Sequence, residues 1–270
     1  MLIALKKILD FYIKSSIHVA LSVLALAQIS VKVAGIEKHP LLLIFIFSSA
    51  LSAYNFIKFF PSLTTTKFEK SSSLFSALIF GFSLLSLGAI YFLPILALAF
   101  TVLGSVLVLG YSIPFSSSSS NWRNKKGWKL NLVVFSWLCL TVGVPLGSVS
   151  AFDPFLFFEL AVLQGIYIYV AIIPFEIGDL HSDEPSLQTL PQQHGVLRAK
   201  RIGFFLLGFG SLFTVFIFEI LSSFTLGTLL IFLILAILLW KSNENQSYYY
   251  ARFWVEGIPI IWWAIIYFID

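Results

Sequence analysis

The most informative stretch of the sequence is Glu176-Ile-Gly-Asp179-Leu-His-Ser-Asp183-Glu184-Pro185, which runs on to Thr189-Leu190-Pro191. It places four carboxylates within ten positions between two long apolar runs, in a chain where charged residues make up only 11%. If Glu176 to Asp183 is helical, Glu176, Asp179 and Asp183 share one helix face. Ionisable groups at a membrane boundary are costly, so this cluster predicts a functional site. The simpler alternative is a solvated loop whose acids cap the next helix.

The composition identifies the class of protein. Hydrophobic residues make up 59% of the 270 positions, mean hydropathy is +0.94, and 29 residues are phenylalanine. Soluble domains are about a quarter charged, so this composition excludes an ordinary soluble fold. The single cysteine, Cys139, excludes an intrachain disulfide and a cysteine metal site. We therefore expect an all-α polytopic membrane protein with one transmembrane domain over residues 1–270.

Repeated apolar runs close to 20 residues long predict about nine transmembrane helices. The serine run Ser116–Ser120 is of low complexity and is interpreted as loop. No interval between the apolar runs is long enough for a soluble domain. The predicted spans are Ser16–Val33, Leu41–Phe59, Leu74–Phe92, Ile95–Ile113, Leu132–Ser150, Phe155–Phe175, Ile202–Ile220, Phe224–Trp240 and Phe253–Ile269.

The basic residues predict how these spans are oriented. With nine spans, all but two of the 17 Lys and Arg residues fall on the side of the N-terminus, and only Lys32 and Lys38 fall on the other. Cytoplasmic loops carry the excess of Lys and Arg. We therefore expect an integral cell-membrane protein whose N-terminus and acidic cluster are cytoplasmic and whose C-terminus is outside. A cleaved signal peptide ending near Ala25-Leu26-Ala27 is the alternative for the first span.

Two further polar segments lie on the predicted cytoplasmic side. Asn55 and Lys58 share a helix face at the end of the second span, where both are expensive. The alternative is that Lys58 extends to the lipid headgroups while Asn55 bonds a neighbouring helix.

The second segment combines Tyr111-Ser-Ile-Pro114 with the basic and aromatic run Asn121–Lys129. Arg123, Lys125 and Lys126 could cover a phosphorylated substrate, because Arg and Lys make charge-assisted bonds to phosphate oxygens. An electrostatic anchor on anionic lipid explains the same residues, with its tryptophans at the membrane interface.

The acidic cluster is the candidate metal site. Carboxylates four positions apart on a helix can hold Mg²⁺, which accepts one or two carboxylates together with substrate phosphates. A bridge from carboxylate through Mg²⁺ to diphosphate would explain why acidic and basic segments lie on the same side. His181 lies inside the cluster, but one histidine without cysteine partners gives little support for zinc.

The arrangement resembles the UbiA superfamily of membrane prenyltransferases. The resemblance covers nearly the whole chain in span count, and it is sharpest in Asp179-Leu-His-Ser-Asp183, followed by Thr189-Leu190-Pro191 and Gly195. This stretch is similar to the second aspartate motif of the family, D-x-x-x-D with T-L-P and Gly. The segments Tyr111–Pro114 and Lys126–Asn131 look like the region after the fourth helix in members such as chlorophyll synthases. The resemblance implies nine helices around a central cavity and prenyl transfer from a prenyl diphosphate.

The chain departs from the family at the first motif, N-x-x-x-D-x-x-x-D. Asn55 matches, but Phe59 and Leu63 stand where the aspartates are expected, and neither can bind a cation. Lys58 and Glu69 are the charged residues near enough to substitute.

Two hypotheses follow from the resemblance. In the first, Asp179 and Asp183, helped by Glu176, hold one Mg²⁺ on the diphosphate, and Lys58 replaces the second metal. Arg123, Lys125 and Lys126 would neutralise the remaining charge, with Asn55 and Tyr111 completing the substrate-binding set. The partners would then be a prenyl diphosphate, a lipid-soluble or aromatic acceptor and membrane lipid, with no nucleic acid.

In the second hypothesis the protein keeps the fold and binds an isoprenoid or quinone-like lipid without catalysis. A small transporter is the third class, but it needs partnered ionisable residues deep within the spans. His18, Glu159 and Glu219 are scattered instead.

Overall fold

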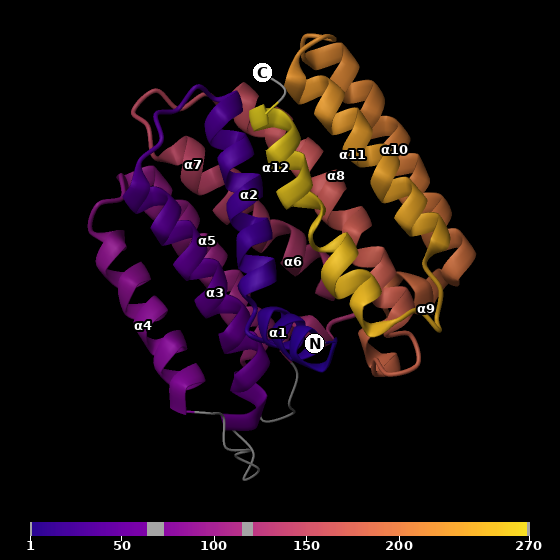
Figure 1. Ribbon diagram of the computed structural model, residues 1–270. Helices are drawn as coiled ribbons and strands as arrows, with labels where there is room; N and C mark the ends of the chain where they lie inside the picture. The colour runs from indigo at the N-terminus through magenta and orange to yellow at the C-terminus, as the bar shows by residue number, and fades with distance from the viewer. Residues whose placement is uncertain (1, 64–72, 115–120, 269–270) are drawn as a thin grey trace.

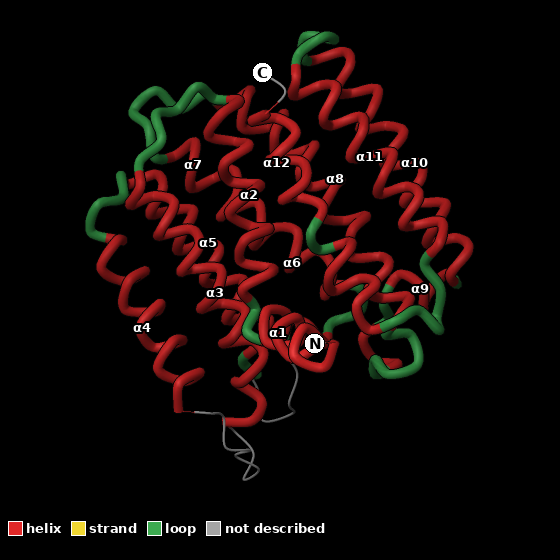
Figure 2. The backbone as a smooth tube through the Cα atoms, viewed as in Figure 1, coloured by secondary structure: helices red, strands yellow, loops and turns green. Residues whose placement is uncertain are grey.

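The chain forms a bundle of helices in the computed structural model, which describes residues 2–63, 73–114 and 121–268 (Figure 1). These residues include no strand (Figure 2). Lys67, Glu69, Lys70 and the serine run Ser116–Ser120 lie outside the described residues. The longer helices are α1 (Leu2–Lys14), α2 (Ile17–Val33), α3 (Pro40–Leu63), α4 (Ser73–Ile90), α5 (Ile95–Ser112), α6 (Trp128–Leu138), α8 (Pro154–Gly178), α10 (Val196–Ile217), α11 (Ser223–Lys241) and α12 (Ile258–Phe268).

Shorter helical segments connect them. Two are π-helical: η2 (Cys139–Gly143), which joins α6 to α7, and η4 (Tyr250–Val255), which precedes α12. π-helical turns are rare, occur mostly as single turns inside α-helices, and are frequent at functional sites. The remaining short segments are η1 (Trp122–Asn124), α7 (Val144–Gly147), η3 (Pro185–Leu187) and α9 (Leu190–His194).

Seven helical stretches in the described part are long and apolar enough to cross a membrane. A bent pair, Leu5–Lys14 with Ile17–Val33, would make an eighth span, and Gly81–Ile90 within α4 is a shorter apolar helix. The chain is therefore an all-helical protein with several candidate membrane-spanning helices, while the count of nine stays a prediction. The seven stretches are Pro40–Phe60, Ile95–Ser112, Trp128–Gly147, Pro154–Gly178, Val196–Ile217, Ser223–Lys241 and Tyr250–Phe268.

Local sequence signals fix where the helices begin. The carboxylate of Asp153 accepts hydrogen bonds from the backbone N–H groups of Phe155 and Leu156 at 2.9 and 3.1 Å, and Pro154 occupies the first turn of α8. The hydroxyl of Ser222 accepts from the N–H of Thr225 at the start of α11. Such caps satisfy N–H groups that lack a partner within the helix.

Two buried cores hold the bundle together. The larger surrounds α8, where Tyr167 packs near Trp262 of α12 with their ring centroids 5.7 Å apart. The smaller lies among α2, α3 and α5. Helices α2 and α12 run side by side (Figure 1), and the side chains of Trp263 and Tyr267 donate hydrogen bonds to Gln28 of α2. The first and last predicted spans are therefore neighbours in space.

Helix α1 and the C-terminal end of α12 lie at opposite ends of the bundle (Figure 1). Helix α1 is bent by 60° from α2. The α8–α9 connection with the acidic cluster lies at the same end as α1 (Figure 1). We call this end of the bundle the α1 end.

Candidate functional site

Asn55 holds the break between α1 and α2. Its side chain is 1% exposed, its amide donates to the carbonyl oxygens of Ser15 and Leu51 at 3.1 and 2.9 Å, and its oxygen accepts from the hydroxyl of Ser16. Ser16 has a φ of 65°, a backbone conformation that costs energy for residues other than glycine. The hydrogen-bonding groups of Asn55 are therefore engaged in fixing this turn, and its predicted contact with substrate stays a prediction.

Lys58 lies one helical turn further along α3. Its ammonium donates to the carbonyl oxygen of Lys14 at 2.6 Å and to the hydroxyl of Ser16 at 3.4 Å. The same ammonium interacts electrostatically with the carboxylate of Glu256 and with the guanidinium of Arg252. Lys58 therefore bonds the α1–α2 break and lies near the segment that precedes α12.

Arg252 links the charged groups near Lys58 to the acidic cluster. It projects from η4, and its Nη2 donates to both carboxylate oxygens of Asp179, at 3.1 and 3.2 Å. The guanidinium also lies over the ring of Tyr248, 4.6 Å from the centroid. About a third of each partner's side chain is exposed, so this ion pair contributes little stability by itself. Its importance is positional, because it links η4 to the end of α8.

The expected helix through the whole acidic cluster is not formed. Helix α8 ends at Gly178, and residues 179–182 form turns closed by the backbone N–H of Asp183 donating to the carbonyl of Asp179 at 2.8 Å. Asp183 therefore leaves the helix face and pairs with Lys129 of α6, with 2.5 Å between Oδ2 and Nζ. Both side chains of this pair are less than a fifth exposed.

The side chain of Glu176 points toward the start of α9. Its carboxylate is 1% exposed; Oε2 accepts from the backbone N–H of Leu190 at 3.1 Å, whereas Oε1 is buried without a hydrogen-bond partner. Thr189 lies beside it and begins α9 with a capping box, in which the Gln192 side chain accepts from the backbone N–H of Thr189 at 2.9 Å. Both residues, together with Lys129, line a small cavity of about 50 Å³. A cavity of this size, lined by polar groups, is large enough to hold a water molecule.

The three carboxylates do not form the expected metal site in this arrangement. Asp179 and Asp183 are engaged by Arg252 and Lys129, and Glu176 shares its cavity with the Lys129 ammonium. No group of three His, Cys, Asp or Glu side chains suited to a metal ion was found in the described part of the chain. The residues therefore do not fit a Mg²⁺ ion held jointly by Asp179 and Asp183, and a role for magnesium stays a prediction from the resemblance.

The remaining predicted residues belong to the end of α5 and to the segment before α6. Tyr111 lies in the last turn of α5, and the Arg123 guanidinium lies over its ring, 5.6 Å from the centroid. The Nε of Arg123 is buried without a hydrogen-bond partner. The Lys125 ammonium lies 5.9 Å from the ring centroid of Trp128. Lys126 and Asp183 line an open hollow of about 710 Å³.

Helix α1 is fastened to the segment around η4. The hydroxyl of Tyr249 donates to Asp10, a bond that raises the pKa of Tyr249 because deprotonation would bring two negative charges together. His18 of α2 bonds the carbonyl oxygen of Phe253 through Nε2 and the hydroxyl of Tyr12 through Nδ1, each at 2.9 Å. Because a carbonyl oxygen only accepts, Nε2 carries the proton.

No sequence pattern singles out Arg252 or Glu256, and Lys129 stands only within the basic run Asn121–Lys129 and the segment Lys126–Asn131. Glu256 had an available signal, since it is the one carboxylate inside the predicted span Phe253–Ile269.

Comparisons of the chain with protein-family models, with curated proteins and with solved structures found no match.

Proposed function

We propose that the protein is a divergent UbiA-type prenyltransferase, which moves a prenyl group from a prenyl diphosphate to a lipid-soluble or aromatic acceptor within the membrane. One observation carries the proposal: Lys58 of α3, Lys129 of α6 and Arg252 of η4 bring three cations to the α1 end, near Asp179 and Asp183. We call these five residues the charged network. The segments that resemble the two family motifs thus meet through residues that neither motif contains.

The charged network can stabilise the negative charge that develops on the leaving diphosphate. In prenyl transfer the bond between the prenyl carbon and the diphosphate oxygen breaks, and the electron pair leaves with the diphosphate. The acceptor then bonds to that carbon and loses a proton. Fixed cations at the leaving group stabilise the charge that develops there. Lys58, Arg252 and Lys129 supply such cations, and Lys126 lines the open hollow beside Asp183.

The ammonium of Lys58 is held in place by the carbonyl of Lys14, which fits a role in positioning phosphate oxygens. A lysine supplies a single charge and three donors, so it cannot orient two oxygens as an octahedral ion does. We therefore expect slow turnover. In this proposal the α1 end faces the cytoplasm and nine helices cross the membrane.

A second candidate is a non-catalytic relative that binds an isoprenoid or quinone-like lipid. The two ion pairs favour it, because Asp179 and Asp183 already have cationic partners and have no shared ligand position. In this role the charged network would fasten the helix ends together.

The test is diphosphate release from a panel of prenyl diphosphates by the purified full chain, with and without Mg²⁺. The variants are Lys58→Met and Arg252→Gln, with Arg198→Gln as the control because Arg198 is exposed at the start of α10. The proposal predicts release that Lys58→Met and Arg252→Gln abolish and Arg198→Gln preserves. Absence of release from every chain length by folded protein would overturn it, and retained binding of the same lipids would then support the second candidate.

A further inference from the structure

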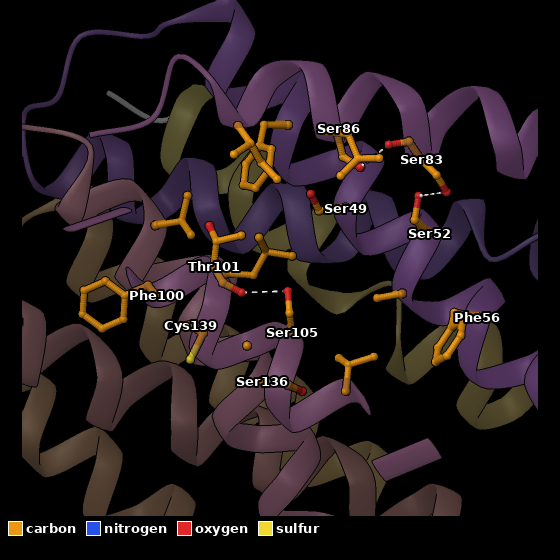
Figure 3. A pocket seen from close by; sticks show the side chains of 18 of the residues that line it. Ser49, Ser52, Phe56, Ser83, Ser86, Phe100, Thr101, Ser105, Ser136 and Cys139 are labelled. Carbon is orange, nitrogen blue, oxygen red and sulfur yellow. Dashed lines mark hydrogen bonds between the residues drawn. The ribbon is translucent and has the colours of Figure 1, made fainter. Parts of the chain in front are cut away.

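An uncharged cavity lies apart from the charged network, in the N-terminal half of the bundle (Figure 3). Its volume is about 370 Å³, within the range of small-molecule sites, which is roughly 300–1,000 Å³. Helices α3, α4, α5 and α6 and the π-helical segment η2 enclose it. Hydroxyl side chains from all four helices line it: Ser49, Ser52, Ser83, Ser86, Thr101, Ser105 and Ser136.

The cavity opens where α4 and α5 fail to pack. Helix α4 packs against α3, and α5 packs against α6, η2 and α7, but α4 and α5 have almost no contact in the described part of the chain. Leu87 of α4 and Leu109 of α5 line the cavity and are 64% and 42% exposed. Both helices carry exposed apolar side chains, so if α4 and α5 cross the bilayer, this opening faces lipid and a molecule can enter sideways.

The hydroxyl groups present acceptors to the cavity. Ser86, Thr101, Ser105 and Ser136 each donate their proton to a carbonyl three or four residues earlier in the same helix, at 2.8 to 3.0 Å. Figure 3 shows the Ser105 bond, with Ser49, Ser52 and Ser86 on the opposite wall. Since these protons are engaged, the oxygen lone pairs remain available to a ligand.

Among the residues that the structure describes, no charged side chain lines the cavity. An anionic ligand would find no cation there and few free donors, and burying an unpaired charge is costly. A purely apolar ligand would leave the hydroxyl oxygens without a new partner. The lining is therefore complementary to a neutral molecule with an apolar body and a hydrogen-bond donor.

We propose that this cavity binds a neutral lipid alcohol that enters from the bilayer between α4 and α5. The hydroxyl of the ligand donates its one proton to the oxygen of Thr101 or Ser105, and its chain lies among the apolar lining residues. A neighbouring cavity of about 120 Å³ shares Ala53, Val108 and Leu140 with the first and provides room for more of the chain. This site is independent of the charged network and does not require prenyl transfer.

The test is binding of tritiated oleyl alcohol to the full chain in lipid nanodiscs, with unlabelled oleyl alcohol, oleyl methyl ether and oleate as competitors. The ether has the same chain but no hydroxyl proton, and oleate carries a negative charge. We expect the alcohol to compete about three- to tenfold better than the ether, because one hydrogen bond separates them. Equal competition by alcohol and ether, or stronger competition by oleate, would overturn the proposal.

Variants locate the hydrogen bond. The double variant Thr101→Val with Ser105→Ala nearly conserves volume and should weaken the alcohol to the level of the ether while leaving the ether unchanged. Ser211→Ala is the control, since Ser211 also donates to its own helix, in α10. If the double variant does not fold, a chain-diazirine analogue of oleyl alcohol in the native protein should label the elements that line the cavity, from α3 to η2, and labelling confined to α8, α10, α11 or α12 would contradict the assignment.

Discussion

The Nζ of Lys129 lies 2.5 Å from Oδ2 of Asp183, and the two side chains are 16% and 13% exposed. This pair ties α6 to the turn after α8, across 54 residues of chain. A second pair, His181 with Glu244 at 2.7 Å, lies in the same region, but its side chains are 76% and 39% exposed. The two pairs therefore differ mainly in their access to water.

This difference predicts unequal coupling in double-mutant cycles of unfolding. Lys129→Met with Asp183→Asn should show a coupling energy of about 1–3 kcal/mol, because removing one partner leaves a shielded charge uncompensated. His181→Asn with Glu244→Gln should show less than about 1 kcal/mol, because water solvates the separated charges. Thermal unfolding in one detergent measures both cycles. Equal coupling would contradict the burial of Asp183.

The charged network predicts how one substitution changes the binding of inorganic diphosphate. Arg252→Gln removes a cation that lies beside Asp179 and near Lys58, so affinity should fall about fivefold, roughly 1 kcal/mol. Isothermal titration calorimetry of the full chain provides the measurement, with Arg198→Gln as the control because Arg198 is exposed at the start of α10. Unchanged binding by Arg252→Gln would exclude an anion site beside this guanidinium.

The contact between α5 and α7 predicts a stability difference between two glycines. A Cβ at Gly147 would lie 2.9 Å from the backbone nitrogen of Ala97, whereas a Cβ at Gly208 of α10 would meet nothing within 4 Å. Gly147→Ala should therefore destabilise the protein by about 1–3 kcal/mol, since backbone cannot move aside easily. Gly208→Ala should be neutral or stabilising by about 0.5–1 kcal/mol. Thermal melts of both variants test the packing of α7.

The orientation in the membrane can be measured with single cysteines in a Cys139→Ala background. Cysteines at Lys126 and Ser247 should resist a membrane-impermeant maleimide added to intact cells, because the α1 end is predicted to be cytoplasmic. Cysteines at Lys38 and Ser150 should react. Permeabilised cells provide the control, since all four should then be labelled. The reversed pattern would contradict the predicted orientation, and a mixed pattern would contradict the span count.

The sequence predicted the helical class and the approximate place of the long helices. Long apolar runs have few alternatives in a bilayer, where backbone groups must be bonded within the segment. The start of α8 was within one residue of its prediction, because Asp153 and Pro154 give a strong local signal. The bend between α1 and α2 was not predicted, since it depends on Asn55, which is remote from Ser15 and Ser16 in sequence.

The candidate site was harder to predict than the fold. Spacing alone suggested that Glu176, Asp179 and Asp183 share a helix face, but that inference needed the helix to continue past Gly178. The positions of the two aspartates depend on tertiary partners, since Arg252 pairs with Asp179 and Lys129 pairs with Asp183. These partners lie 73 and 54 residues away in the chain, and no local pattern indicates such pairings.

The π-helical segment η4 sets the angular position of Arg252 relative to α12. Each residue of an α-helix advances the chain by about 100°, and a π-helical turn accommodates one residue more than an α-helical turn. Shortening Tyr250–Val255 by one residue would therefore rotate everything before the deletion by about that angle. Arg252 would move away from Asp179 while the apolar content of the span stayed almost the same. Sequences that differ here by a single deletion could thus have the same hydropathy profile and a different charged network.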